Sequence, residues 1–494
     1  MNQSIDPVDF LKYKKRIIYG AGRVARLHLP ILLNFDKSWG DSEIWDINYD
    51  KLKPLCGITV QKPDFNSILD FETTAVFIAL SFNKNREAVN ETEKKFLKAG
   101  CKNIFLLEDI LSKKVHIDDF VNNAYSDCTY EDDMDFGGKT PLVKPIAFYL
   151  PQFHEIPENN EWWGKGFTEW TNTRKSVPRF KGHYQPREPH DDFGYYDLSD
   201  PDVIRKQAEL AKRHGIYGWA VYYYWFSGKT LLTKPIDLLL ANKDIDINFC
   251  LTWCNEPWTK GWVGDDSTTL IDNEKHEGAL DNFIDDIKDY LLDDRYIKVD
   301  GKPLIIIYHA HRIPNPEKTI AYWRNRAKEL GIGDIAIFSV RRPYTLKDMS
   351  LEDCLDGEMD FTNASDSIPI RLINDEKDEI SKFATSYENY AQNYRKQIIA
   401  ESDKTYRSCM CGFDNSPRYA RNFVTHDIAF KKKQLYEMAK CIVDDALRTD
   451  KEYIFVFAWN EWAESAYLEP DKRFGYMTIN TLSKAIHGLP LDCD

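Results

Sequence analysis

The residues best placed to do chemistry lie near the C-terminus, in the segment Phe457-Ala-Trp-Asn-Glu-Trp-Ala-Glu464. An apolar run at 453–458 predicts a buried strand that ends there. Glu461 and Glu464 are three positions apart, so on a turn or helix they share a face, with Cβ atoms roughly 5–6 Å apart. Retaining chemistry at a sugar's anomeric carbon uses carboxyl groups about 5–5.5 Å apart. Because the chain has 79 acidic residues, such a pair also arises by chance, and a structural role stays open.

Short apolar segments separated by helical patterns position this pair. Eight strands are predicted after residue 142, at 145–150, 217–223, 247–253, 303–308, 334–339, 357–362, 407–412 and 453–459. Amphipathic helices are predicted at 201–214, 278–292, 316–330 and 426–448. This alternation favours a (β/α)8 TIM barrel, in which functional sites lie at the C-terminal ends of the strands.

Polar and aromatic residues cluster at five of these strand ends. Aromatic rings provide flat apolar walls for a sugar, and polar side chains can bond its hydroxyls. We therefore predict a substrate-binding set of Tyr149, Gln152, His154, Trp163, Glu169, Trp170, Tyr224, Trp253, Asn255, Glu256, Trp258, His309, Asn460 and Trp462. Each aromatic ring could instead pack in the core. His309 and His311 share a strand face, but no third ligand is apparent, so no metal site is predicted.

The N-terminal part of the chain has a different pattern. An apolar strand at 16–22 runs into a glycine turn containing Gly20 and Gly22, and a second strand ends at Asp46. This order predicts a small Rossmann-like α/β domain at 1–118, a linker at 119–141 and the barrel at 142–494. The domain's further strands are expected at 75–80 and 102–107, and its helices at 23–33 and 87–100. The glycines and Asp46 suit a nucleotide or nucleotide-sugar, while the short domain equally suits a structural role, so both stay open.

Composition excludes several classes of function. The net charge of −14 argues against nucleic-acid binding, which depends on clusters of Lys and Arg. No apolar run approaches 18 residues, so no transmembrane segment is predicted, although peripheral membrane contact stays open. The N-terminus lacks the pattern of a secretory signal, and the ten cysteines form no CxxC pair. These features favour a cytoplasmic protein with reduced thiols.

Several long motifs carry a resemblance to a known family. Phe148-Tyr-Leu-Pro-Gln-Phe-His154, Trp253-Cys-Asn-Glu-Pro-Trp258 and Trp459-Asn-Glu-Trp-Ala-Glu464 occur in order within about residues 142–480. This part of the chain resembles the WbsX-type proteins of bacterial surface-polysaccharide loci, which are related to glycoside hydrolase family 99. The active-site motif of those endo-α-mannosidases, Asn-Glu-Trp-His-Glu, is similar to residues 460–464, with Ala463 in place of His.

The resemblance implies an enzyme that needs no cofactor or metal and acts with retention. By this likeness Glu461 is a base that deprotonates the sugar 2-hydroxyl, and Glu464 is the acid that protonates the leaving oxygen. We expect Glu464 to be the less solvated of the two, since a general acid must keep its proton. The favoured function is glycosyl transfer in O-antigen or capsule biosynthesis. A glycosidase, a non-catalytic glycan-binding scaffold and Glu256 as the acid are the alternatives.

Overall fold

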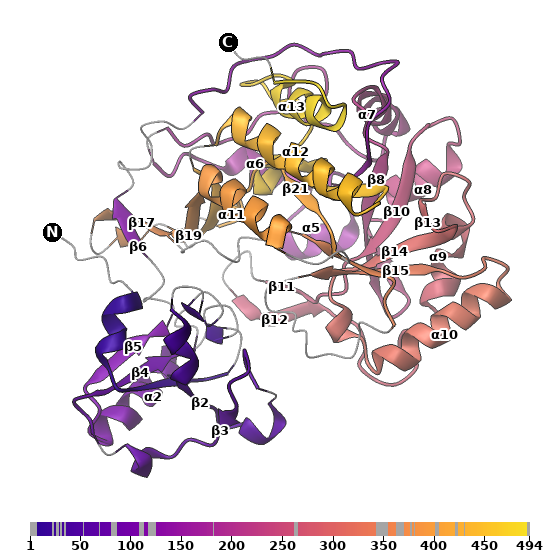
Figure 1. The fold of residues 1–494 in the computed structure, drawn as a ribbon. Helices are drawn as coiled ribbons and strands as arrows, with labels where there is room; N and C mark the ends of the chain where they lie inside the picture. Colours follow the sequence, from indigo (N-terminus) through magenta and orange to yellow (C-terminus); the bar gives the residue numbers. More distant parts are fainter. Residues whose placement is uncertain are drawn as a thin grey trace.

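A computed structural model of the chain contains two α/β units, a small one at the N-terminus and a larger one built around a barrel-like sheet (Figure 1). The structure describes residues 7–21, 24–25, 29, 32–33, 36–52, 54–68, 70–80, 86–107, 113–116, 125–180, 182–260, 265–341, 354–361, 370–375, 378–379, 381–400, 405–419, 423–428 and 430–491.

The small unit is a five-stranded parallel sheet. Successive residues of its central strand, such as Ile17 and Ile18, belong to separate apolar clusters, because a parallel sheet covered on both faces buries both sets of side chains. The strands predicted from the sequence are present, whereas the predicted helix at 23–33 falls largely outside the described residues. The strands follow the order β3 (Val60–Gln61), β2 (Glu43–Trp45), β1 (Lys15–Tyr19), β4 (Thr74–Ile78), β5 (Asn103–Leu106), and the helix is α2 (Arg86–Lys98).

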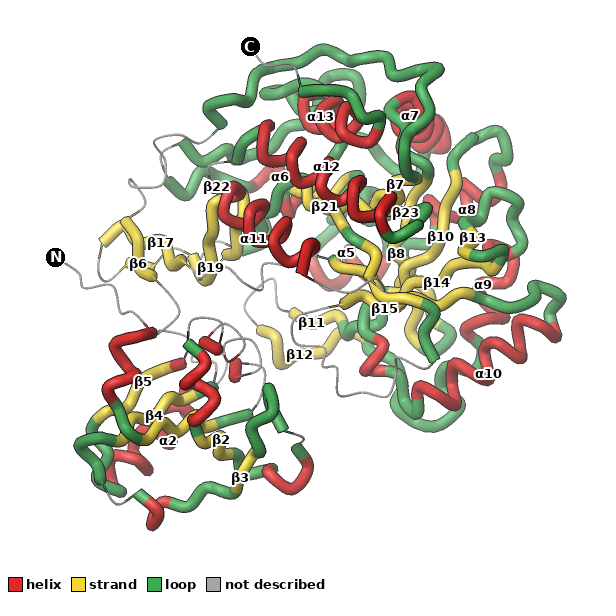
Figure 2. Tube along the Cα trace, viewed as in Figure 1, coloured by secondary structure: helices red, strands yellow, loops and turns green. Residues whose placement is uncertain are grey.

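The large unit is organised by a nearly closed parallel sheet, and every predicted strand is present in it. Its strands are rich in buried apolar residues because helices cover their outer faces (Figure 2). The strands are β7 (Lys144–Tyr149), β8 (Gly218–Phe226), β10 (Asn248–Trp253), β14 (Lys302–Ile307), β15 (Ala336–Arg341), β16 (Gly357–Asp360), β20 (Thr405–Tyr406) with β21 (Ser408–Met410), and β23 (Tyr453–Phe457). The two ends of this sheet are two short strands on either side of Arg407, one paired with β16 and the other with β23.

The covering helices carry clear local signals. In α7, Pro201 occupies the first turn, and the carboxylate of the N-cap residue Asp200 accepts the backbone N–H of Asp202 at 2.9 Å. Ile204, Ala208 and Ala211 recur at helical spacing and are buried. The helices are α5 (Pro157–Trp163), α6 (Glu169–Lys175), α7 (Pro201–Arg213), α8 (Lys234–Ala241), α9 (Phe283–Leu291), α10 (Pro316–Glu329), α11 (Tyr387–Ala400), α12 (Lys432–Arg448) and α13 (Met477–Ile486).

Smaller sheets branch from the barrel. One of them was not anticipated: it joins strands from 370–428 to β6 (Lys113–His116), which pairs in parallel with β17. Residues 426–428, expected to begin a helix, belong to this sheet. The remaining strands are β17 (Ile370–Asp375), β18 (Asp378–Glu379), β19 (Ser381–Ser386), β22 (Phe423–Ile428), β9 (Lys229–Leu231), β13 (Lys298–Val299), and the hairpins β11 (Trp258–Lys260) with β12 (Asp265–Ile271) and β24 (Asn460–Glu461) with β25 (Ala466–Tyr467).

The described part of the expected linker, residues 125–141, is bonded to the large unit. The backbone N–H of Tyr125 donates to Phe430 O at 3.1 Å, and that of Glu131 donates to Phe474 O at 3.1 Å. The side chain of Asn480, on α13, donates to the Glu131 carboxylate and to Asp132 O. The described part of the expected linker therefore packs against the large unit.

Candidate active site

A cavity of about 400 Å³ lies at the C-terminal ends of the barrel strands. Segments that follow β7, β10, β14, β16, β21 and β23 meet there, as a site in a parallel barrel requires. It is lined by Leu150, Gln152, Trp163, Tyr222, Tyr224, Cys254, Glu256, Pro257, Trp258, Thr259, Tyr308, Phe361, Arg418, Tyr419, Phe457, Glu461 and Glu464. Six of these residues are Trp or Tyr, so much of the wall offers flat apolar surface with a polar edge.

A hairpin after β23 presents the two glutamates. Glu461 ends β24, and Glu464 ends the single 3-10 turn η7 (Trp462–Glu464). Asn460 clamps the hairpin to the end of β7, because its Oδ1 accepts the Leu150 N–H at 2.7 Å and its Nδ2 donates to Leu150 O at 3.0 Å. Asn460, predicted to bind substrate, is thus fully engaged with the backbone and holds the hairpin in place.

The guanidinium of Arg418 bonds three carboxylates. Arg418 donates to Oε1 of Glu169 through Nε at 2.9 Å and Nη2 at 2.6 Å. Its Nη2 also donates to Oε2 of Glu461 at 3.2 Å, and its Nη1 donates to Oε1 of Glu464. Glu461 and Glu464 therefore lie side by side on the same wall, as expected, while Glu169 is buried behind Arg418.

The cluster contains more negative than positive groups. Burial raises the pKa of Glu461 well above its ordinary value; the Glu464 carboxylate raises it further, and Arg418 opposes the shift. For Arg418, burial lowers the pKa but the three carboxylates outweigh it, so the pKa stays above its ordinary value. Three carboxylates around one guanidinium favour a proton on one of them. The cluster can therefore hold an acid and a base together.

The expected difference in solvation between the glutamates is wrong. The Glu461 side chain is 6% exposed and the Glu464 side chain is 18% exposed. Glu461 is the more buried because it lies on the strand of the hairpin nearest β7, whereas Glu464 lies at the turn.

Five of the predicted binding residues line the cavity: Gln152, Trp163, Tyr224, Glu256 and Trp258. Trp258 meets Tyr224 edge to face, with ring centroids 5.0 Å apart. The Glu256 side chain is 48% exposed, and its Oε2 is 3.0 Å from Nε2 of the buried His309. Asn255 holds His309 through two backbone bonds, at 2.8 and 2.9 Å. Asn255 and His309 therefore support Glu256 from behind instead of lining the cavity.

Tyr149 and Trp253 do not line the cavity, contrary to the sequence prediction. Successive side chains of a strand point to opposite faces, and their neighbours Leu150 and Cys254 take the inward positions. The Tyr149 hydroxyl donates to Gln207 Oε1 on α7 at 2.8 Å. The Trp253 ring packs between β10 and the helices α9 and α10, against Phe283 and Trp323.

Three more predicted residues are buried next to the site. The rings of Trp170 and Trp462 contact each other, with centroids 5.5 Å apart. Nε1 of Trp170 donates to Tyr196 O at 2.7 Å. His154 lies 3.0 Å, through Nδ1, from Pro151 O, and burial lowers its pKa. These side chains form the layer behind the cavity wall, because the segments after β7 and β23 fold over one another there.

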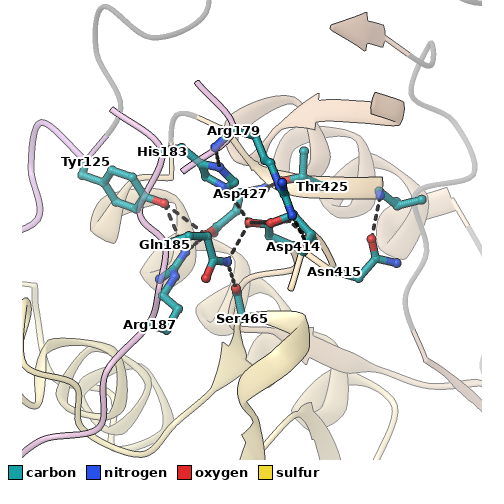
Figure 3. A network of polar contacts seen from close by, with 12 residues as sticks. Tyr125, Arg179, His183, Gln185, Arg187, Asp414, Asn415, Thr425, Asp427 and Ser465 are labelled. Atoms are coloured by element: carbon teal, nitrogen blue, oxygen red, sulfur yellow. Dashed lines mark hydrogen bonds and ion pairs between the residues drawn. The ribbon is translucent and has the colours of Figure 1, made fainter. Parts of the chain in front are cut away.

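A second polar network supports the turn at Glu464 from the other side (Figure 3). The Asp414 N–H donates to Glu464 O at 2.7 Å, and Gln185 Nε2 donates to both Asp414 Oδ2 and Ser465 Oγ. His183 Nε2 is 2.6 Å from Asp414 Oδ2. The loop between α6 and α7 is thus tied to the segment that carries Arg418.

The glycine turn of the small unit is closed by its own acidic residue. Oδ2 of Asp46 accepts the Ala21 N–H at 2.8 Å, and Oδ1 accepts the Asn48 N–H at 2.8 Å. Gly20 has φ +103°, which its lack of a side chain allows, whereas Gly22 lies outside the described residues. One Asp46 oxygen therefore holds the glycine turn, and the other bonds the backbone two residues after Asp46.

Within the described ranges, no three His, Cys, Asp or Glu side chains gather as a metal site would require. The helices in the same ranges include none with the length and apolar character needed to cross a bilayer.

Comparison with known proteins places this site in a family. The model of the family described as "Glycosyltransferase WbsX" matches residues 145–482, which span the barrel strands and the hairpin with Glu461 and Glu464. The chain belongs to this family. It is also 36% identical over 352 residues to the uncharacterized protein WxcX of two strains of Xanthomonas campestris pv. campestris, covering 70% of this chain and 50% of the relative. The chain thus spans about half the length of these curated relatives.

Solved structures show more distant likeness. The GH99 endo-alpha-mannosidase from Bacteroides thetaiotaomicron, in complex with BIS-TRIS-Propane, is 17% identical, with a TM-score of 0.43 over 70% of this chain and 95% of that one. A structure described as a glycoside hydrolase-like protein is 12% identical, with a TM-score of 0.46 over 75% of this chain and 99% of that one.

Proposed function

We propose that this member of the WbsX family transfers a glycosyl unit with retention, using Glu461 and Glu464, in the assembly of a bacterial surface polysaccharide. The observation that carries the proposal is the sharing of one guanidinium by two carboxylates at the edge of an aromatic-lined cavity. The description of the family supports transfer as the outcome. A carbohydrate is the substrate class that such a wall suits.

Proton transfer by the pair accounts for retention. Glu461 accepts the proton of the sugar 2-hydroxyl, whose oxygen attacks C1 while the bond from C1 to the leaving oxygen breaks. Glu464 gives its proton to that oxygen. In the second step an acceptor hydroxyl attacks C1 and gives its proton to Glu464, while the bond from C1 to the sugar 2-oxygen breaks and that 2-oxygen regains its proton from Glu461. Burial and the Glu464 carboxylate raise the pKa of Glu461, so the ionised Glu461 carboxylate has a high affinity for the proton of the sugar hydroxyl.

The charge of the cavity favours an uncharged saccharide. Its lining includes Glu256, Glu461 and Glu464, and Arg418 already bonds three carboxylates. A diphosphate placed here would meet these carboxylates at short range, where repulsion is strong in a partly desolvated site. We therefore assign saccharides to the barrel cavity.

A nucleotide or nucleotide-sugar is proposed for the small unit. We interpret residues 1–118 as a Rossmann-like domain, 119–141 as the linker and 142–494 as the barrel domain. The support is the parallel strand order β3-β2-β1-β4-β5, which is the order of nucleotide-binding sheets, and the glycine turn after β1.

Incubation with labelled saccharides tests the proposal. The panel contains fluorescent α- and β-linked oligosaccharides, with and without nucleotide-sugars, and products are identified by mass spectrometry. A glycosyl unit should be gained or lost, and Glu461→Gln and Glu464→Gln should each lower the rate by roughly 10²–10⁴ while the proteins stay folded. Asp293→Asn, a buried carboxylate bonded to Arg295 on the outside of the barrel, is the matched control.

Each alternative has its own outcome. Release of free sugar without transfer identifies a glycosidase. Full rates in both glutamine variants would contradict the paired-glutamate mechanism, whereas a parent protein that binds saccharides without converting any of them would favour a scaffold. A Glu256→Gln variant that is inactive beside a normal Glu464→Gln variant would assign the acid to Glu256.

A further inference from the structure

Glu469 is a buried carboxylate behind the hairpin that carries Glu461. It follows β25 and is 1% exposed. Its Oε1 accepts from Gln207 Nε2 at 2.6 Å and Trp459 Nε1 at 3.1 Å. Its Oε2 accepts from Tyr196 OH at 2.8 Å and Trp462 Nε1 at 2.7 Å. One side chain thus bonds four groups from three separate segments.

The direction of each of these hydrogen bonds follows either from the chemistry of the donor or from a further contact. An indole N–H can only donate, which fixes the bonds from Trp459 and Trp462. Gln207 Oε1 accepts from the Tyr149 hydroxyl, so the Gln207 amide nitrogen faces Glu469. The Tyr196 hydroxyl accepts from Asn460 Nδ2 at 3.4 Å and donates its own hydrogen to Glu469. All four neighbours are donors, and the ionised carboxylate is the form that accepts all four.

We propose that Glu469 is a positioning residue whose ionised carboxylate holds Trp459 and Trp462, and thereby Glu461, in the geometry that glycosyl transfer needs. The two tryptophans stand immediately before and after Asn460-Glu461 in the chain. Their rings are anchored on the same carboxylate, so the backbone between them has little freedom. This role rests on the proposed function of Glu461, whereas the anchoring of the two indoles does not.

The surroundings make this anchor sensitive to protonation. Among the described groups that contact Glu469, Tyr196 is the titratable one; Tyr149 lies one hydrogen bond further away on Gln207, and burial raises the pKa of both tyrosines. Glu461, on the same hairpin, is turned to Arg418. Burial raises the pKa of Glu469 to about 7, while its four hydrogen bonds lower it. A proton on Glu469 would place an O–H against one of the four donors and break that bond.

The NMR signals of the two indole N–H groups report directly whether Glu469 is protonated. The full chain is labelled with ¹⁵N-tryptophan, and the Nε1–H signals of Trp459 and Trp462 are assigned from Trp459→Phe and Trp462→Phe. Between pH 5 and 8 both signals should shift together with one midpoint, and should stay constant in Glu469→Gln. They should still shift in Glu461→Gln, which separates Glu469 from the cavity pair. Signals that are constant in the parent, or that shift equally in Glu469→Gln, would overturn the proposal.

Turnover provides the second measurement. On a saccharide converted in the panel above, Glu469→Gln should lower kcat at least tenfold with little change in KM and should flatten the acid limb of the pH profile. Glu469→Asp, which keeps the charge, should recover part of the rate. An unchanged kcat and pH profile in a folded Glu469→Gln protein would contradict the positioning role. If Glu461→Gln and Glu464→Gln are fully active while the indoles titrate as expected, the failure lies in the proposed function and not in the anchor.

Discussion

Two buried carboxyl groups support the hairpin that carries Glu461 and Glu464 from opposite sides, and their surroundings differ. Asp414 contacts His183 and Gln185 and bonds Glu464 through its backbone, whereas Glu469 accepts from two indoles, a phenol and an amide. Burial raises the pKa of both groups. At Asp414, His183 and the other donors outweigh burial and lower the pKa to about 2, but at Glu469 burial prevails.

The comparison teaches that hydrogen bonds alone do not offset the burial of a carboxylate. Four neutral donors surround Glu469, and its proton affinity is still raised. Asp414 has a partner that can carry positive charge, and its proton affinity falls. The four neutral donors therefore fix the orientation of the Glu469 carboxylate, whereas the partner of Asp414, which can carry positive charge, favours its ionised form. Arg418 is shared among three carboxylates, and the pKa of Glu461 stays raised because burial and the Glu464 carboxylate outweigh the guanidinium.

The largest effect is expected from removing the shared cation. Arg418→Met leaves the buried Glu169 and Glu461 and the half-buried Glu464 without their partner, so the free energy of unfolding at pH 8 should fall by about 3–5 kcal/mol. The loss should be smaller at pH 5, where protons can replace the guanidinium. Urea denaturation at both pH values measures this, with Arg418→Lys as the control that keeps the charge. Equal stability of Arg418→Met and the parent at pH 8 would show that the cluster is not held by charge.

A smaller effect on the free energy of unfolding is expected from the ionisation of Glu469. Its folded pKa of about 7 exceeds the ordinary value of 4.5, so the folded state binds more protons between these values and stability falls as pH rises through this window. The change amounts to roughly 3 kcal/mol and is complete above about pH 7. Glu469→Gln should lack it. Denaturation of both proteins from pH 4.5 to 8 tests the sign, and parallel curves would refute it.

The smallest effect is expected at Asp414. Its folded pKa of about 2 lies below the ordinary value of 3.8, so its ionisation contributes about 2 kcal/mol above pH 3.8, and the contribution is lost as pH falls toward 2. Asp414→Asn should therefore be less stable than the parent at pH 7 and equally stable near pH 2. Thermal unfolding at the two pH values is the measurement. A stability difference that persists at pH 2 would mean that the amide disturbs packing instead.

Periodicity and motif spacing predicted the barrel strands and the glutamate pair, because each of these depends on residues close together in the chain. Strand parity went wrong at Tyr149 and Trp253, since an aromatic residue near a strand end fits a cavity wall and a helix interface equally well. The inward neighbours Leu150 and Cys254 look less suited to a sugar, yet they line the cavity.

Arg418 and Glu469 were missed for a different reason. Arg418 acts through Glu169, 249 positions away, and Glu469 acts through Gln207, 262 positions away. No local pattern encodes such distances. The sequence does contain a signal for Arg418, because this residue follows the predicted strand at 407–412 and functional residues of a barrel lie after the C-terminal ends of its strands. Glu469 has no such signal, as an acidic residue after a short strand is ordinary.

The packing of residues 125–141 has a practical consequence for dividing the chain. Truncation at residue 142 would remove Tyr125, whose hydroxyl bonds Asp427, and Glu131, whose carboxylate bonds Lys432 and Asn480. It would also expose the faces of α12 and α13 that these residues cover. An expression fragment of the large unit should therefore start before Lys113, so that it keeps β6, which pairs with β17, and residues 125–141.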